Sequence, residues 1–154
     1  MRKIAFSALI LAFSATGLMG QNPAKVSFKL NHAMGLDSGA TAVFEIKIEP
    51  SKGWHVYSAQ ASEEGVYKPT VIEYDLNSRG FSADDKISEN GLMFTEYDDI
   101  MEGTMRYYKA PVTFSQRVRI NADEVFLKGA VDYMACDDEK CLVFTEEFEI
   151  KPEE

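Results

Sequence analysis

The stretch that decides the fold is at residues 133–142, which read Tyr-Met-Ala-Cys-Asp-Asp-Glu-Lys-Cys-Leu. It holds the two cysteines of the sequence, Cys136 and Cys141, which are separated by four polar residues. Apolar residues recur at mostly even spacing on either side of it, at Val125, Leu127, Val131 and Tyr133 and then at Leu142, Phe144, Phe148 and Ile150. Such alternation is typical of half-buried strands, and two runs joined by a short polar loop predict a β-hairpin. Both thiols would then lie at the strand ends, near the exposed tip of the hairpin.

Alternating apolar runs earlier in the chain predict further strands. These runs are found at residues 26–30, 42–48, 54–58, 69–76, 105–107 and 112–120. Residues typical of turns separate them, and no window shows a sustained apolar period of 3.6. About seven or eight short strands in one chain of 154 residues predict a single all-β domain, an antiparallel β-sandwich.

Residues 81–103 differ from the rest of the chain in their charge. They carry seven acidic residues against a single lysine, and a few aromatic and aliphatic residues interrupt the acidic ones. A long segment of this kind inside a small β domain is usually a functional loop or a disordered one. The aromatic residues favour an ordered, functional loop over disorder.

The N-terminal residues have the pattern of a secretory signal peptide. Arg2 and Lys3 give a positive start, and the apolar run that follows at 4–13 is interrupted only by Ser7. We expect cleavage near Gly20, which gives a signal peptide at residues 1–20 and one domain at residues 21–154. An uncleaved anchor is the alternative, but the apolar run is shorter than the about 20 residues that a membrane span needs.

Export and charge limit the functions open to this chain. Export would place the two cysteines in an oxidising compartment, where they are able to pair. No later segment is apolar enough to cross a membrane, so after cleavage we expect no integral membrane protein. The formal net charge of −9 repels phosphate backbones and argues against a nucleic-acid partner.

The cysteine pair has three interpretations, of which two are structural. A permanent disulfide would staple the hairpin, and closing a loop of this size stabilises a fold by about 2 kcal/mol. Alternatively, Cys136 and Cys141 would supply two ligands of a metal site completed by His32 or His55, although a structural zinc site needs four ligands. His55 stands in a strand pattern beside Trp54, and we interpret both residues mainly as structural.

The third interpretation is a redox-active dithiol. A disulfide at the tip of a hairpin is accessible to the thiolate of another protein, as exchange requires. Asp137, Asp138 and Glu139 disfavour a thiolate nearby, whereas Lys140 favours one beside Cys141. The reduced pair would therefore be a weak nucleophile, and its disulfide would be opened by an incoming thiolate of low pKa. The spacing differs from that of a thioredoxin motif, which has two intervening residues.

Three parts of the sequence resemble a known family. They are Gly-Trp-His-Val-Tyr-Ser at residues 53–58, Pro69 at the start of a strand, and the stretch at 133–142. Together they resemble the N-terminal periplasmic domains of thiol:disulfide interchange proteins of the DsbD family, over about residues 26–150. The resemblance implies an immunoglobulin-like β-sandwich in the periplasm that exchanges electrons with thioredoxin-fold proteins. We expect no cofactor and no metal.

The resemblance also implies roles for individual residues. Cys141 matches the cysteine that forms the mixed disulfide with partners, and Cys136 matches the one that closes and opens the intramolecular bond. The family has an acidic cap loop that shields the disulfide with an aromatic side chain. The matching residues here are Asp98, Asp99, Ile100 and Met101, with Phe94 or Tyr97 as the shielding ring.

The chain departs from the family in two respects. It has Val143 and Phe144 where the family often has two prolines, and we expect a free-standing copy without a membrane segment or a thioredoxin domain. The first hypothesis is thus a monomeric electron carrier, which would act as a protein-disulfide reductase or as a component of such a system. The alternative is a secreted, non-catalytic binding module with a structural disulfide.

Overall fold

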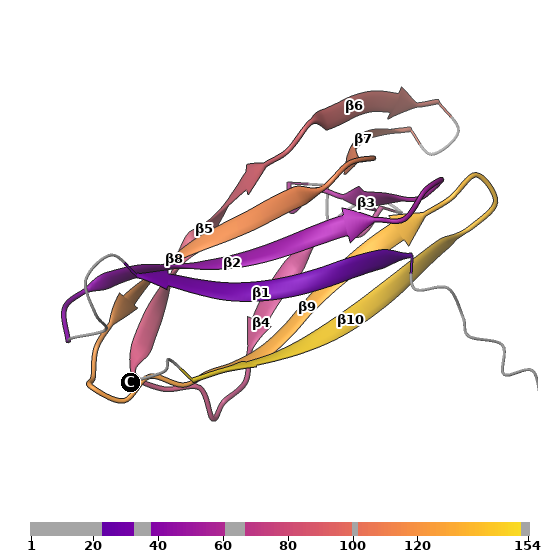
Figure 1. Cartoon of the computed structure of the whole chain (residues 1–154). Coiled ribbons are helices and arrows are strands. Elements are labelled where there is room, and N and C mark those ends of the chain that lie inside the picture. The colour runs from indigo at the N-terminus through magenta and orange to yellow at the C-terminus, as the bar shows by residue number, and fades with distance from the viewer. Residues whose placement is uncertain (1–22, 33–37, 61–66, 100–101, 152–154) are drawn as a thin grey trace, which may run out of the picture.

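The computed structural model describes residues 23–32, 38–60, 67–99 and 102–151. These residues form ten strands (Figure 1): β1 (Ala24–His32), β2 (Thr41–Pro50), β3 (His55–Tyr57), β4 (Val71–Tyr74), β5 (Phe81–Asn90), β6 (Met93–Asp98), β7 (Gly103–Tyr108), β8 (Val112–Ile120), β9 (Leu127–Cys136) and β10 (Cys141–Ile150). The predicted signal peptide at residues 1–20 lies outside the described residues. Within those ranges there is no helix with the length and apolarity to cross a membrane.

The strands form two antiparallel sheets that face each other. One sheet has the order β1-β2-β8-β5, and the other has the order β10-β9-β3-β7-β6, with β4 pairing β9 beside β3. Figure 1 shows the β6–β7 hairpin and the tip of the β9–β10 hairpin at the same end of the molecule. The prediction of an immunoglobulin-like, all-β sandwich is confirmed.

The core lies between the two sheets and follows from the alternation of apolar residues. In β2, Phe44, Ile46 and Ile48 are fully buried, whereas the residues between them are exposed or half-buried. The ring of Phe44 packs 4.7 Å from that of Phe148, which comes from β10 in the other sheet. Burying these large side chains is the main contribution to the stability of the fold.

The prediction of a functional loop over residues 81–103 is wrong for residues 81–98, which form β5 and β6. β5 pairs β8 in one sheet, and β6 pairs β7 in the other, so the chain changes sheets between them. The pairing of β5 shifts register between Ala83 and Ile87, which is a bulge or a similar irregularity. Such a shift interrupts the period of two by which a strand is recognised in sequence.

Three strands hold β9, the strand that carries Cys136. β10 pairs it along its whole length, while β3 and β4 share its other edge. A Cβ atom at Gly129 would lie 2.1 Å from the carbonyl oxygen of Glu73, so the close approach of β4 requires glycine there. β9 is therefore paired on both edges, which places Cys136 on a well-supported element.

Candidate functional site

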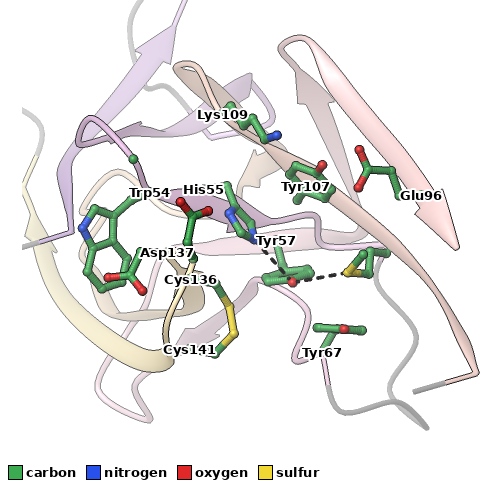
Figure 2. Close-up of a pocket in the computed structure, with 13 residues that line it drawn as sticks. Trp54, His55, Tyr57, Tyr67, Glu96, Tyr107, Lys109, Cys136, Asp137 and Cys141 are labelled. Carbon is green, nitrogen blue, oxygen red and sulfur yellow. Dashed lines mark hydrogen bonds between the residues drawn. A yellow bond between two sulfur atoms is a disulfide. The ribbon is translucent and has the colours of Figure 1, made fainter. Parts of the chain in front are cut away.

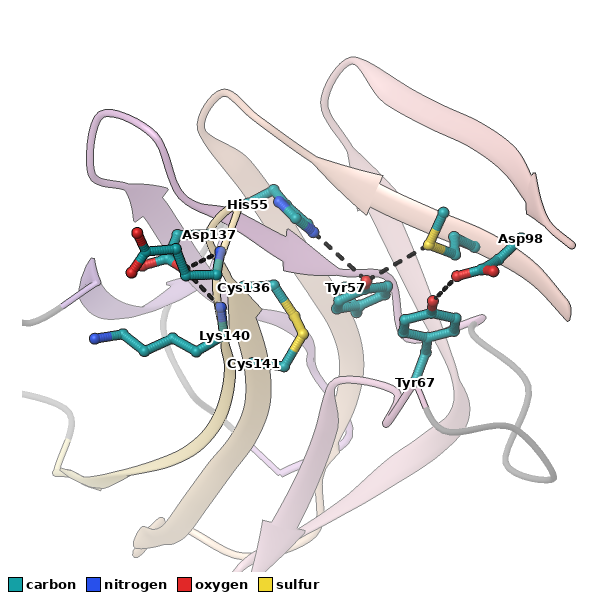
Figure 3. The surroundings of a disulfide bond; sticks show 10 residues. His55, Tyr57, Tyr67, Asp98, Cys136, Asp137, Lys140 and Cys141 are labelled. Carbon is teal, nitrogen blue, oxygen red and sulfur yellow. Dashed lines mark hydrogen bonds between the residues drawn. A yellow bond between two sulfur atoms is a disulfide. The ribbon is translucent and has the colours of Figure 1, made fainter. Parts of the chain in front are cut away.

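The tip of the β9–β10 hairpin carries a disulfide between Cys136 and Cys141, which are direct cross-strand partners (Figure 3). The hairpin prediction is confirmed, and the two Cα atoms lie 4.1 Å apart. The two residues differ sharply in exposure, because Cys136 is only 2% exposed whereas Cys141 is exposed. Cys141 is thus the more accessible end of the bond.

The four residues between the cysteines form a turn fixed by Asp137. Its carboxylate accepts hydrogen bonds from the backbone N–H groups of Glu139 (2.9 Å) and Lys140 (2.8 Å). These bonds, led by that from Glu139, lower the pKa of Asp137 from its usual 3.8. The ammonium of Lys140 lies 5.7 Å from the centre of the Trp54 ring, which ties the turn to the residue preceding β3.

The disulfide lies on the sheet with the order β10-β9-β3-β7-β6, on the face that points away from the core. Along β9, Tyr133 and Ala135 face the core between the sheets, so Met134 and Cys136 point to the opposite face. There Cys136 belongs to a separate apolar cluster, which we call the outer cluster. Its buried members are Tyr57, Tyr107, Met134 and Cys136, with Tyr67, Phe94 and Met105 packed against them.

Aromatic rings make up most of the outer cluster. Tyr57 stacks on Tyr67 with ring centres 5.0 Å apart, and Phe94 stacks on Tyr107 at 5.6 Å. The imidazole of His55 lies 4.7 Å from the ring of Tyr107, and its Nε2 is 3.5 Å from the hydroxyl of Tyr57. These contacts join β3, β6, β7 and the segment before β4 into one surface.

A cleft of about 420 Å³ opens on this surface beside the disulfide (Figure 2). Both cysteines line it together with His55, Tyr57, Tyr67 and Tyr107. Its charged groups are Glu96, Lys109, Asp137 and Asp138. The cleft therefore combines a sulfur–sulfur bond with aromatic walls, an imidazole and charges of both signs.

Burial shifts the titration of the ring residues in the cleft. The pKa of His55 falls below 6.5, chiefly because burial disfavours its charged form and then because of the nearby Lys109. Burial and a hydrogen bond to Asp98 raise the pKa of Tyr67 to about 12. Burial and a hydrogen bond to Glu96 raise that of Tyr107 to about 12. At neutral pH the cleft thus holds a neutral imidazole and neutral phenols.

Comparison with protein-family models finds no match, and no curated protein matches either. Two solved structures are similar to this chain. The N-terminal periplasmic domain of ScsB from Proteus mirabilis has 17% identity and a TM-score of 0.58, over 86% of this chain and 48% of that one. The N-terminal domain of DsbD from Neisseria meningitidis, in the reduced form, has 16% identity and a TM-score of 0.52, over 81% of this chain and 83% of that one.

The fold is that of the DsbD N-terminal domain. The resemblance inferred from the sequence is thus confirmed at the level of the fold, at an identity too low to carry over more. The chain spans about half the length of the ScsB chain that it matches. Among the described residues, no three His, Cys, Asp or Glu side chains gather in a metal-binding arrangement.

The residues predicted from the DsbD resemblance to cap the disulfide have different surroundings. Phe94 packs on the outer cluster, and Asp98 accepts a hydrogen bond from the hydroxyl of Tyr67 (Figure 3). Tyr97 is 62% exposed, and Asp99 is exposed just after β6. Ile100 and Met101 lie outside the described residues, so their capping role stays a prediction.

Several cleft residues were not singled out in the sequence. Tyr67, Tyr107 and Lys109 come from separate segments, and no local spacing connects them to the cysteines. Trp54 and His55, interpreted mainly as structural, also line the cleft. The signal available for His55 was its place next to Trp54 in the motif at residues 53–58, which the DsbD resemblance marked as distinctive.

Proposed function

We propose that this chain is a periplasmic thiol–disulfide interchange domain that carries electrons between thioredoxin-fold proteins. Cys141 is the sulfur that partners attack, and Cys136 is the resolving one. The observation that carries the proposal is the unequal exposure of two bonded cysteines beside an open cleft. Exchange needs an accessible sulfur for in-line attack. Cys141 is exposed, whereas Cys136 is buried.

The exchange moves two electrons in two steps. A thiolate of a reduced donor attacks Sγ of Cys141, the bond to Cys136 breaks, and Sγ of Cys136 leaves with the electron pair. The second cysteine of the donor, as a thiolate, then attacks the donor sulfur that is bonded to Cys141. Cys141 leaves as a thiolate. The donor dithiol becomes a disulfide and the cysteine pair becomes reduced, after which the reverse steps reduce an acceptor.

The two similar solved structures support the proposed location and the two redox states of this reaction. The ScsB domain is periplasmic by its description, and the DsbD domain was solved in its reduced form, whereas the present pair is oxidised. Within the proposal, residues 1–20 are a cleaved signal peptide and residues 21–154 form a monomeric periplasmic domain. The direction of electron flow follows from the potentials of the two partners.

The proposal includes a protective cover on the disulfide. In the proposal Phe94, Tyr97, Asp98 and Asp99 take part in this cover, together with Ile100 and Met101, which lie outside the described residues. Two contacts support it, namely the packing of Phe94 on the outer cluster that contains Cys136 and the hydrogen bond from Tyr67 to Asp98. The cover would shield the Cys136 end of the disulfide, since Cys141 is already exposed, and docking of a partner would displace it from that end.

Trapping of a mixed disulfide tests the proposal. In Cys136→Ala the resolving sulfur is absent, so Cys141 stays a thiol that attacks the disulfide of an oxidised thioredoxin-fold protein. The partner's second sulfur leaves as a thiolate, and this chain has no sulfur left to resolve the mixed disulfide on Cys141. We expect a disulfide-linked species with such a protein in periplasmic extract, and we expect none with the control variant Cys141→Ala. Failure to trap any thioredoxin-fold protein through Cys141 would contradict the proposal.

A redox titration separates exchange from the alternative of a binding module with a structural disulfide. Structural disulfides have potentials below about −300 mV, whereas exchange components lie above that value. Equilibration of the Cys136–Cys141 pair with dithiothreitol and glutathione buffers gives the potential. A potential below about −300 mV favours the binding module with a structural disulfide.

A further inference from the structure

Cys136 must lose a proton in every cycle of the proposed exchange, although it has little contact with water. It is 2% exposed and packs among Tyr57, Tyr107 and Met134. Apolar surroundings disfavour a thiolate, so a reduced Cys136 needs a base close by to become a nucleophile. Solvent is a poor candidate for this base because the residue is almost fully covered.

His55 is placed to be that base. It is the direct cross-strand partner of Cys136, since β3 pairs β9 in this register. Side chains of directly opposed residues lie on the same face with Cβ atoms about 4.5–5.5 Å apart. Both residues line the cleft, and Figure 2 draws His55 and the disulfide among the side chains around it.

The other titratable groups around the cleft are less suited to this step. The carboxylate of Asp137 is engaged by the two backbone N–H groups of the turn. Burial raises the pKa values of Tyr57, Tyr67 and Tyr107, so their phenols stay protonated near neutral pH. Glu96 accepts a hydrogen bond from Tyr107.

The charges facing His55 keep it a neutral base. Burial and Lys109, just after β7, lower its pKa, while Asp138 and Asp137 in the turn and Glu96 on β6 act in the opposite direction. The net result is a pKa below 6.5, so the imidazole is mostly unprotonated at pH 7. Its Nε2 lies 3.5 Å from the hydroxyl of Tyr57, which helps to orient the ring.

We propose that His55 takes the proton of the Cys136 thiol when Cys136 resolves a mixed disulfide on Cys141, and returns it when the disulfide opens. The inference rests on the proposed function. In the resolving step the imidazole accepts the proton, and Sγ of Cys136 attacks Sγ of Cys141. The bond from Cys141 to the partner sulfur breaks, and the partner leaves as a thiolate with the electron pair. The new Cys136–Cys141 bond restores the oxidised domain.

A small disulfide tests this step without any partner protein. Dithiobis(nitrobenzoate) reacts with the reduced domain in two phases, each of which releases one coloured thionitrobenzoate anion. The first phase leaves a thionitrobenzoate group on Cys141, and in the second Cys136 displaces it. We expect His55→Gln to slow the second phase at pH 7 by about 10²-fold, the lower end of the usual contribution of a general base. The first phase is expected to change little.

The pH profile distinguishes a base from a structural residue. In the wild type the second phase should rise through a pKa below 6.5 and then level off, as His55 loses its proton. In His55→Gln it should keep rising to higher pH, as the thiol ionises unaided. Added imidazole should partly restore the second phase in His55→Ala, which controls for loss of packing.

Identical second-phase rates and pH profiles in the wild type and His55→Gln would overturn the inference, as would a complete lack of imidazole rescue in a folded His55→Ala. Thermal unfolding of each oxidised variant checks that it is folded. The outcome is independent of the trapping experiment. Failure to trap a thioredoxin-fold protein would remove the proposed function and leave the measured role of His55 in resolution unchanged.

Discussion

Tyr133 carries a hydroxyl that is buried in the core and has no hydrogen-bond partner among the described residues. A buried polar group without a partner destabilises a fold, so Tyr133→Phe should raise the free energy of unfolding by about 1 kcal/mol. Tyr74→Phe is the matched control, because the hydroxyl of Tyr74 donates to Oε1 of Gln116 at 2.9 Å. It should lower the free energy of unfolding by about 1 kcal/mol. Urea denaturation measures both, and equal losses in the two variants would show that the hydroxyl of Tyr133 is paired.

Asp137 makes the turn between the cysteines sensitive to acid. Its pKa in the folded chain is lowered from 3.8, so its hydrogen bonds are fully present above that pH. They are lost as the pH falls below 3.8 through the lowered value. The amide proton shifts of Glu139 and Lys140 should therefore titrate below pH 3.8 in the NMR spectrum. Asp137→Asn should abolish the inflection, and an inflection at or above 3.8 would contradict the role of the carboxylate as acceptor.

At the scale of elements, Glu89 connects β5 to the other sheet. Its carboxylate accepts hydrogen bonds from the buried hydroxyls of Tyr108 (2.6 Å) and Ser58 (3.0 Å). Glu89→Ala leaves both donors without this acceptor and should lower the free energy of unfolding by about 1–3 kcal/mol. Glu147→Ala, at an exposed position of β10, should change it by less than about 0.5 kcal/mol. Equal effects of the two substitutions would mean that solvent replaces the carboxylate.

Strand β5 also shows how far the sequence predicts the structure. Regular alternation is visible in β2, β8, β9 and β10, and all four were predicted from it. β5 was missed because its register shifts between Ala83 and Ile87, and because the inward-facing Glu89 is acidic. The hairpin was predicted from the alternation on either side of the cysteines, whereas their pairing was expected from export and from the DsbD resemblance. The cleft was not predicted, because Tyr67, Tyr107 and Lys109 lie far from Cys136 in the sequence and come together only in the fold.

At the scale of the whole molecule, charge should govern the rate of encounter with partners. The chain has a net charge of −9, and Asp138 and Glu139 are exposed beside Cys141. Opposite charge steers association, and salt screens it beyond about 8 Å at 0.15 M. Exchange with a basic thioredoxin-fold protein should slow about tenfold between 0.01 M and 0.15 M salt. Stopped-flow fluorescence measures the rate.

Two controls accompany the salt dependence. Mercaptoethanol attacks as a thiolate anion, which the acidic turn repels, so its reaction with the disulfide should speed up as salt increases, opposite to the response to a basic partner. Replacement of Asp138 and Glu139 by lysine should flatten the response to a basic partner. An unchanged salt dependence in that double variant would place the steering charges elsewhere on the surface.

With Cys136 buried and Cys141 exposed, every visiting protein must use the same sulfur atom in the proposed exchange. Only the oxidised pair reacts with a donor and only the reduced pair reacts with an acceptor, so the two must alternate at Cys141. A surplus of donor would hold the pair reduced, and a surplus of acceptor would hold it oxidised. The scarcer of the two would then limit the overall rate of electron transfer.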